Sequence, residues 1–231
     1  MIKKIFHYMI FSLMLCITLS GCDKHEMIQD YSTKVGHILC TDGKVVPLER
    51  CIDEGKTPIA VVFHLNQENP GEKGYAVYLK DISRVAFADS LGVKQNTSAD
   101  IAAFDGNENT HAIYSTANMG SPLAESVFSI WEYGQSAYVP SVAQMTLLYH
   151  AKAVINPYLE SIGGVPISDE PDRCWYWTST EVKGQEAAKA WLYSLGSGAR
   201  QETPKDESHK VRPIVTIYGL QYGREQRPYY R

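Results

Sequence analysis

The order of apolar patterns along the chain restricts its fold more than any other feature. The run from Thr57 to Leu65 is rich in β-branched residues and almost continuously apolar, and Tyr75 to Lys80 follows a connector with turn residues. These runs predict a pair of strands. The last third returns to the same pattern, and we predict that Ala190 to Leu195 pairs with Val211 to Tyr218. Strands at both ends with helices between them predict an α+β domain whose ends share one sheet.

Helical patterns occupy the middle of the chain. Ser121-Pro122 is typical of a helix cap and first-turn proline, and it leads into Leu123 to Trp131. Ser141 is followed three residues later by Gln144, which is the pattern of a capping box, and apolar residues then recur at helical spacing. Because proline disrupts a helix interior, Asn156-Pro157 predicts the end of this second helix. A short helical continuation through Tyr158, Leu159 and Ile162 is then predicted to end at Gly163-Gly164.

The first residues are typical of an export signal rather than of a folded domain. Lys3 and Lys4 precede an apolar run from Ile5 to Leu19, which has the length of a signal peptide and not of a membrane span. Leu19-Ser20-Gly21-Cys22 resembles a bacterial lipobox, and the resemblance implies cleavage before Cys22 and acylation of that cysteine. An ordinary secretory signal is the alternative. We predict a lipoprotein signal peptide (1–21), a lipidated tether (22–34), a folded domain (35–218) and a C-terminal tail (219–231).

The predicted location is the cell envelope, with the lipid at Cys22 in the outer membrane of a Gram-negative bacterium and surface exposure left open. Asp23 after the cysteine leaves the inner membrane open as well. The formal charge is −4 for the whole chain, and it becomes −6 when residues 1–21, with Lys3 and Lys4 as their only charges, are removed. This mild acidity without a basic stripe argues against nucleic acid as the main partner.

Three cysteines remain in the predicted domain. Cys40 and Cys51 flank the turn signal Thr41-Asp42-Gly43, and an exported chain meets an oxidising environment. A local disulfide between Cys40 and Cys51 is therefore one interpretation. The other is that these two and Cys174 stay buried free thiols.

Motifs of metal or catalytic chemistry are largely missing. Asp105, Asn107 and Asn109 alternate like calcium ligands, but Thr110 stands where an EF-hand loop requires glycine. We therefore predict an Asx-rich turn there and no metal. The sequence contains no zinc-binding spacing, no serine-hydrolase elbow and no phosphate-binding loop. We therefore predict that the chain is not an enzyme and that it binds no cofactor.

Four ordered segments resemble one family. They are Tyr138-Val139-Pro140-Ser141 with Gln144, Tyr176-Trp177-Thr178-Ser179-Thr180-Glu181, Ala190-Trp191 and Val211-Arg212-Pro213-Ile214. In this order they resemble the bacterial Lcl C-terminal-domain-like family, and the resemblance implies a C-type-lectin-like fold from about Val35 to Tyr218. The tripeptides with which calcium-dependent lectins bind sugars do not occur, so the resemblance does not extend to a calcium-bridged sugar site.

The segment from Trp177 to Glu181 is the first candidate for ligand contact. An aromatic ring beside hydroxyls and a carboxylate offers a ligand an apolar face and hydrogen-bond partners. The alternative is that Trp177 belongs to the core and that Arg212 pairs with Glu181 rather than with a ligand. The full candidate set for ligand binding is Trp175, Trp177, Glu181, Tyr193, Arg200 and Arg212.

The sequence thus predicts a membrane-anchored binding module, such as an adhesin, that recognises a glycan or a protein without catalysing a reaction. A second hypothesis is a structural or accessory subunit of a surface polymer or envelope complex. A fold by itself supports both, because one fold hosts many functions.

Overall fold

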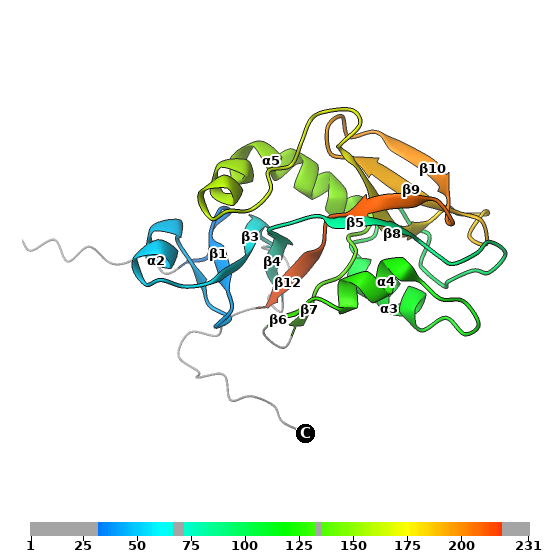
Figure 1. Ribbon diagram of the computed structural model, residues 1–231, viewed down its shortest axis with the longest axis horizontal. Helices are drawn as coiled ribbons and strands as arrows, with labels where there is room; N and C mark the ends of the chain where they lie inside the picture. The colour runs from blue at the N-terminus through cyan, green and yellow to red at the C-terminus, as the bar shows by residue number, and fades with distance from the viewer. Residues whose placement is uncertain (1–31, 67–71, 133–134, 219–231) are drawn as a thin grey trace, which may run out of the picture. The chain divides into compact units, whose positions relative to one another are not determined.

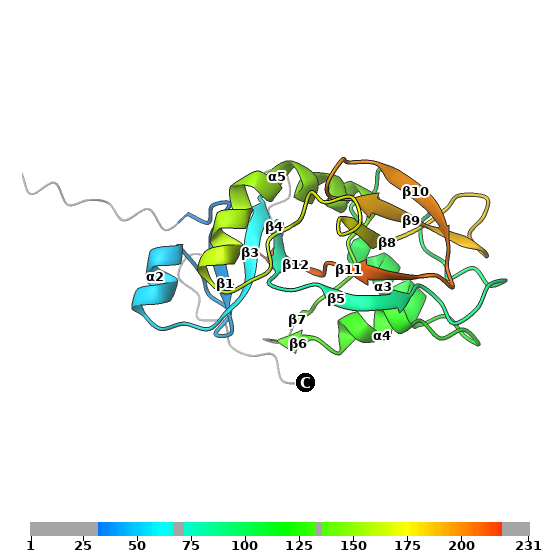
Figure 2. The same cartoon turned by 45° about the horizontal axis from the view of Figure 1, so that its top comes forward.

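The computed structural model describes residues 32–66, 72–132 and 135–218, and Figures 1 and 2 show the arrangement of their helices and strands. The predicted signal peptide, the lipidation site Cys22, nearly all of the tether and the C-terminal tail lie outside these residues. The predictions made for them stay predictions. No helix in the described part of the chain is both long enough and apolar enough to cross a membrane.

The first sheet joins the two ends of the domain, as the sequence predicted. Its strand order is β12-β4-β3-β1-β2. β4 pairs in antiparallel fashion with β3 and with β12, which confirms both the predicted hairpin and the sheet shared by the two ends. Pro213 directly precedes β12, where no strand hydrogen bond requires its missing N–H. The strands are β1 (Ile38–Cys40), β2 (Val45–Val46), β3 (Pro58–His64), β4 (Glu72–Tyr78) and β12 (Ile214–Tyr218).

The second sheet has the order β10-β9-β8-β11-β5. Its strands are β5 (Ile82–Ala86), β8 (Trp175–Glu181), β9 (Lys189–Ser194), β10 (Arg200–Pro204) and β11 (Ser208–Val211). The predicted pairing of the last two apolar runs is wrong, because β9 pairs with β8 and β10, whereas β12 belongs to the first sheet. The polar segment between these runs forms β10, which pairs with β9, and most of β11, which pairs with β5 and β8.

The described helices are α2 (Leu48–Asp53), α3 (Gly106–Tyr114), α4 (Pro122–Phe128) and α5 (Val142–Ser161). Both predicted caps are confirmed: Ser121 accepts a hydrogen bond from the Ala124 N–H, and Ser141 forms the capping box with Gln144. α4 ends at Phe128, earlier than predicted, because Trp131 belongs to the short strand β6 (Trp131–Glu132), which pairs with β7 (Gln135–Ser136).

Two further predictions about helices are wrong. The predicted break at Asn156-Pro157 does not occur, because Ile155 and Leu159 are fully buried on either side of the proline and their packing outweighs the lost helix hydrogen bond. α5 instead runs on to Ser161, and Gly163 follows at a φ of 74°, where the predicted continuation was expected to end. The predicted Asx-rich turn around Asn107 and Asn109 is the helix α3.

The core consists of two hydrophobic clusters, and successive residues of β8 and of β9 belong to different clusters. Tyr176 and Tyr193 pack with α5 residues in one cluster, whereas Trp177 and Leu192 pack with residues of α3 and α4 in the other. Successive residues of a strand point to opposite faces of a sheet, so α5 covers one face of the second sheet and α3 with α4 covers the other. The chain therefore has a mixed α+β architecture.

Candidate functional site

Trp177, the centre of the predicted site, belongs to the core. Its side chain has no exposed surface. The ring packs edge-on against Phe87 and His209, with centroid distances of 5.5 and 5.2 Å. Its Nε1–H donates to the carbonyl of Val85 at 3.0 Å. Both the apolar ring and the polar atom are used inside the protein, so Trp177 is not free to contact a ligand.

Glu181 and Lys205 form an ion pair of 2.8 Å, and both side chains have 0% exposed surface. The Glu181 carboxylate also accepts hydrogen bonds from Gln95 N, Thr97 N and Thr97 Oγ1. Lys205 Nζ donates to the carbonyls of Val93 and Glu186 as well. The charged groups are therefore fully bonded, as burial of ions requires. Together they hold the loop at residues 93–97 against β8.

Arg212 does not pair with Glu181, so that prediction is wrong. Its guanidinium is fully buried and donates to Asp81 Oδ1 at 2.8 Å and to the carbonyl of Val165 at 2.7 Å. Asp81 also accepts from Lys210 Nζ at 3.1 Å and from Tyr176 Oη at 3.2 Å. Burial raises the pKa of Tyr176, and the nearby Asp81 charge acts in the same direction. Arg212 thus belongs to a structural ion cluster beside β8.

The remaining candidates do not form one site. Tyr193 faces Tyr176 across the β8–β9 pair and Arg200 across the β9–β10 pair, so these side chains share one face of the sheet. Trp175 precedes Tyr176 in β8 and lies on the opposite face, where it packs against the Trp177 cluster. Tyr193 is 3% exposed. Only the half-buried Trp175 and the exposed Arg200 remain accessible, on opposite faces.

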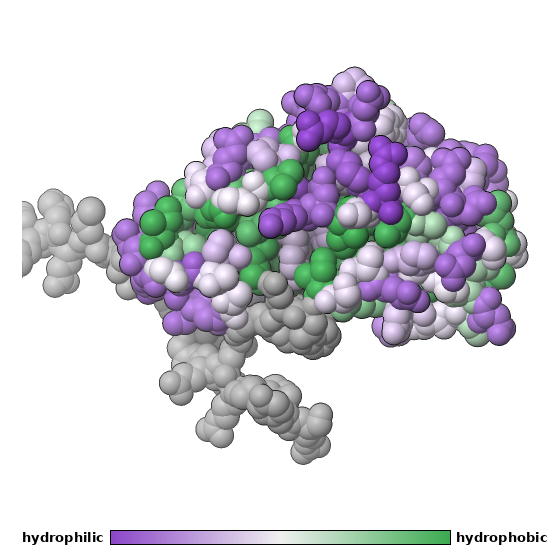
Figure 3. All heavy atoms as spheres, in the orientation of Figure 1, coloured by the Kyte–Doolittle hydropathy of each residue, from purple (hydrophilic) through white to green (hydrophobic). Residues whose placement is uncertain are grey.

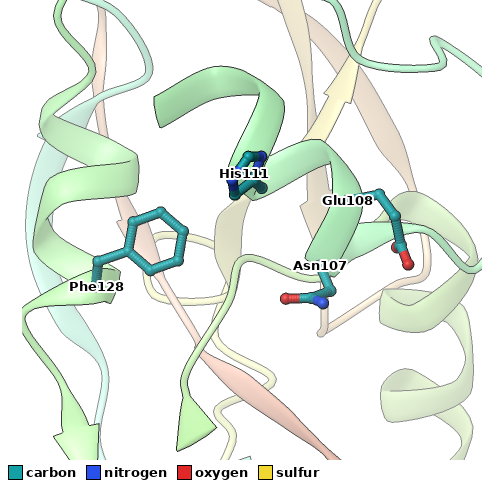
Figure 4. Close-up of a pocket in the computed structure, with 4 residues that line it drawn as sticks. All are labelled: Asn107, Glu108, His111 and Phe128. Carbon is teal, nitrogen blue, oxygen red and sulfur yellow. The ribbon is translucent and has the colours of Figure 1, made fainter. Parts of the chain in front are cut away.

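A hollow between α3 and α4 offers a different group of side chains to solvent. Asn107, Glu108 and His111 of α3 and Phe128 of α4 line a volume of about 380 Å³. Figure 4 shows Phe128 reaching from α4 toward α3, where Asn107 and His111 lie, while the Glu108 carboxylate extends away from Phe128. Asn107, Glu108 and His111 are exposed, and Phe128 is half-buried. A hollow that combines an aromatic ring with polar groups is a candidate binding site.

Contacts at each end of the hollow position its side chains. The Phe128 ring packs edge-on against Tyr114 of α3, with 4.9 Å between centroids, and Ser115 Oγ lies 3.5 Å from His111 Nδ1. Ser121, the cap of α4, donates through its hydroxyl to the Phe87 carbonyl at 2.6 Å. Phe87 in turn packs on Trp177. The buried core under the second sheet therefore sets the position of α4.

The start of α3 is held by its asparagine and glycine. Asn109 Nδ2 donates to Asp105 Oδ1 at 2.8 Å, and Asn109 Oδ1 accepts from Ser98 N at 3.0 Å. A Cβ added to Gly106 would lie 2.6 Å from the Val139 carbonyl, so only glycine allows α3 to begin this close to the start of α5. Burial raises the pKa of Asp105.

Asn109 and Asp105 thus bond to each other and to the backbone. Within residues 32–66, 72–132 and 135–218, no three His, Cys, Asp or Glu side chains are placed to hold a metal ion. The three cysteines of the domain are free thiols in the structure. Cys40 Sγ and Cys51 Sγ lie 3.8 Å apart, and burial raises the pKa of Cys40 to about 12. A disulfide between them stays a prediction.

The hydropathy of the surface differs between the two regions. On the face shown in Figure 3, hydrophilic residues gather over β10 and over the loop that precedes β8, whereas residues of intermediate hydropathy cover α3 and α4.

Sequence reasoning did not select the hollow, because residues 105–110 were predicted as a turn. A helical spacing of four and three residues relates Asn107, His111 and Tyr114, and this signal could have found one wall of it. Comparison of the chain with protein-family models and with curated proteins gives no match.

Proposed function

We propose that this chain is an exported lipoprotein, anchored through Cys22 in the envelope of a Gram-negative bacterium, and that it binds a ligand without catalysing a reaction. The observation that carries the proposal is the hollow between α3 and α4, where exposed polar side chains surround a half-buried aromatic ring. The candidates Trp177 and Glu181 of β8, in contrast, are buried and bonded inside the protein. A rigid, internally bonded scaffold with functional groups at its surface is the usual arrangement of a binding domain.

The mixed α+β architecture supports a C-type-lectin-like domain as the fold family. Its ends share one sheet, as expected for such a domain from the ordered motifs between Tyr138 and Ile214. The proposed ligand is a glycan or a protein, and the proposed site is the hollow. This replaces the site predicted around Trp177, because the Trp177, Glu181 and Arg212 side chains have no exposed surface.

Binding is tested with the full chain, purified in detergent, against a panel of defined saccharides and peptides. We compare the wild type with Phe128→Ala, which removes the aromatic wall of the hollow. Val154→Ala is the control, because Val154 is a 55% exposed apolar residue of α5 outside the hollow. We expect at least one ligand whose binding is lost in Phe128→Ala and retained in Val154→Ala. Equal binding by both variants would place the site elsewhere.

The anchor is tested in cells by incorporation of a labelled fatty acid. We expect labelling of the wild type and none of Cys22→Ser. A non-permeant protease added to intact cells then reports whether the domain faces outward. Purification from mildly solubilised membranes separates the two functional hypotheses, since a binding module comes out alone and a structural subunit in a fixed ratio with its partner.

A further inference from the structure

We propose that the free edge of the second sheet binds the same edge of a second copy of this chain, with β10 pairing against β10 in antiparallel fashion. The two sheets then continue into each other across a twofold axis that passes through Gln201. This inference goes beyond the proposed function and does not depend on the hollow or on its ligand.

The first observation is that β10 is an open strand. It is the outermost strand of the second sheet, and among the described residues only β9 pairs with it. Figures 1 and 2 both show it along the rim of the domain. Its first three residues, Arg200, Gln201 and Glu202, are exposed. A strand edge of this kind presents N–H and C=O groups with which another strand can pair.

The pairing with β9 determines which backbone groups of β10 point outward. Ser194 N donates to the Ala199 carbonyl at 2.8 Å, so these two residues form a hydrogen-bonded pair. Hydrogen-bonded and non-hydrogen-bonded pairs alternate along an antiparallel ladder. Gln201 therefore bonds to β9, whereas Arg200 and Glu202 direct their N–H and C=O groups away from the sheet.

One antiparallel register satisfies these outward groups. With Gln201 on the twofold axis, Arg200 of each copy lies opposite Glu202 of the other copy. Each such pair exchanges both of its backbone hydrogen bonds, and the two Gln201 residues form the non-hydrogen-bonded pair between them. Pro204 has no N–H, so the ladder ends at that end of β10.

The same register brings opposite charges together, and this identifies the occupant as a second copy. Directly opposite residues of antiparallel strands share a face, so Arg200 and Glu202 of the two copies form ion pairs on both sides of the axis. Within the described residues, Arg200 forms no ion pair. Glu202 contacts Lys189 at 3.2 Å and Gln185 at 3.0 Å, both through Oε2, so Oε1 is left for the second copy.

The other edges of the two large sheets lack this complementarity. β2 and β12 contain no charged residue, and β5 contains Arg84 but no acidic residue. Charges on an edge strand usually oppose association of edges. In β10 they oppose the registers centred on Arg200 or Glu202, where like charges lie opposite each other, and they favour the register centred on Gln201.

The register is tested by cross-linking of the full chain in detergent with copper phenanthroline and air. Gln201→Cys places the two thiols at the axis, where opposite Cα atoms lie about 4.5 Å apart, within the range for a disulfide. Ala199→Cys is the matched control, an exposed neutral residue beside the strand whose two copies lie more than about 10 Å apart. We expect a disulfide-linked dimer from Gln201→Cys only, and the wild type measures the background from its own cysteines.

The charges are tested by sedimentation of the full chain in detergent over a range of concentrations. Arg200→Glu and Glu202→Arg each place like charges opposite one another, and each should weaken the dimer by at least about tenfold. The double variant restores opposite charges and should recover the dimer. Arg84→Glu is the control, because Arg84 is an exposed arginine of the edge strand β5, and it should leave the dimer unchanged.

The proposal is overturned if Gln201→Cys cross-links no more than Ala199→Cys, if the wild type sediments as a monomer at every concentration, or if the double variant does not recover the dimer. An edge that binds a strand of a different protein would give the first two of these results. Ligand binding at the hollow is measured separately with Phe128→Ala, so the failure of one proposal is distinguishable from the failure of the other.

Discussion

The second sheet and the hollow between α3 and α4 differ in whether their carboxylates are bonded to cations inside the protein. In the sheet, the Glu181 carboxylate pairs with Lys205. Beside it, the Asp81 carboxylate pairs with Lys210 and Arg212. In the hollow, Glu108 is exposed and has no cation partner among the residues that the structure describes. Both regions combine aromatic rings with carboxylates, so composition alone does not distinguish a structural cluster from a binding surface. Burial and internal bonding do.

The comparison also shows how one region supports the other. The Glu181–Lys205 pair holds the loop at residues 93–97, and this loop leads into the segment where Ser98 N donates to Asn109 of α3. Asn96 in this loop and Ala99 just after it have positive φ values of 59° and 53°, which are uncommon for residues other than glycine. The buried ion pair thus stabilises a loop whose conformation is locally unfavourable and which positions α3.

Breaking the buried pair should have the largest effect on the sheet. Lys205→Met leaves Glu181 as an uncompensated buried charge, so we expect the free energy of unfolding to fall by about 3–5 kcal/mol. Urea denaturation followed by circular dichroism measures it. The double variant Lys205→Met with Glu181→Leu should recover much of this loss, because replacing both ions by apolar groups removes the desolvation penalty. A single-variant loss below about 1 kcal/mol would mean that the pair does not stabilise the sheet.

A disulfide between Cys40 and Cys51 would be the next largest contribution to the framework. The two sulfurs lie 3.8 Å apart across the β1–α2 segment, and closing a loop of this length stabilises a chain by about 3 kcal/mol. We expect the exported protein, isolated without reductant, to unfold at lower urea concentration after reduction. The variant Cys40→Ser with Cys51→Ser should be insensitive to reductant. Alkylation of both cysteines in the unfolded, unreduced wild type would show instead that they remain thiols.

Patterns that act locally were sufficient to predict much of this fold. The hairpin of β3 and β4 and the caps at Ser121 and Ser141 follow from neighbouring residues, and the shared sheet follows from the order of apolar runs. β10 was missed because its exposed, polar sequence, Arg200–Pro204, has no apolar alternation, and its strand conformation depends on pairing with β9. The strand propensity of a segment does not predict pairing with a strand that lies elsewhere in the chain.

The site was harder to predict because it depends on contacts between distant residues. Arg212 meets Asp81, 131 positions away, and Glu181 meets the loop near Gln95 and Thr97. Neither pairing leaves a trace in sequence spacing, so their burial could not be foreseen. α3 was missed for a related reason: Asn109 has low helix propensity, and its bonds to Asp105 and Ser98 exist only in the folded chain.

The cap of α4 connects the two regions, and its removal should have an intermediate effect. Ser121 accepts from Ala124 N at 3.2 Å and donates to the buried Phe87 carbonyl at 2.6 Å. We expect Ser121→Ala to lower the free energy of unfolding by about 1–2 kcal/mol, in the range for a lost N-cap. Ser129→Ala, at the exposed end of the same helix, is the control and should change it by less than about 0.5 kcal/mol. Equal effects of the two substitutions would show that the link to Phe87 contributes nothing.

The smallest effect on stability should come from the hollow itself. Glu108 lies exposed in the first turn of α3 and forms no ion pair among the residues that the structure describes. Glu108→Gln therefore removes only the interaction of its charge with the helix dipole. That interaction contributes about 0.3–1 kcal/mol, and the same urea titration should give a loss within this range. Glu181→Gln in parallel should cost several times more, because the Glu181 carboxylate is buried against Lys205. If Glu108→Gln destabilised the chain as strongly as Glu181→Gln, Glu108 would be part of the structural framework. The distinction between the buried, paired carboxylates of the sheet and the exposed carboxylate of the hollow would then not hold.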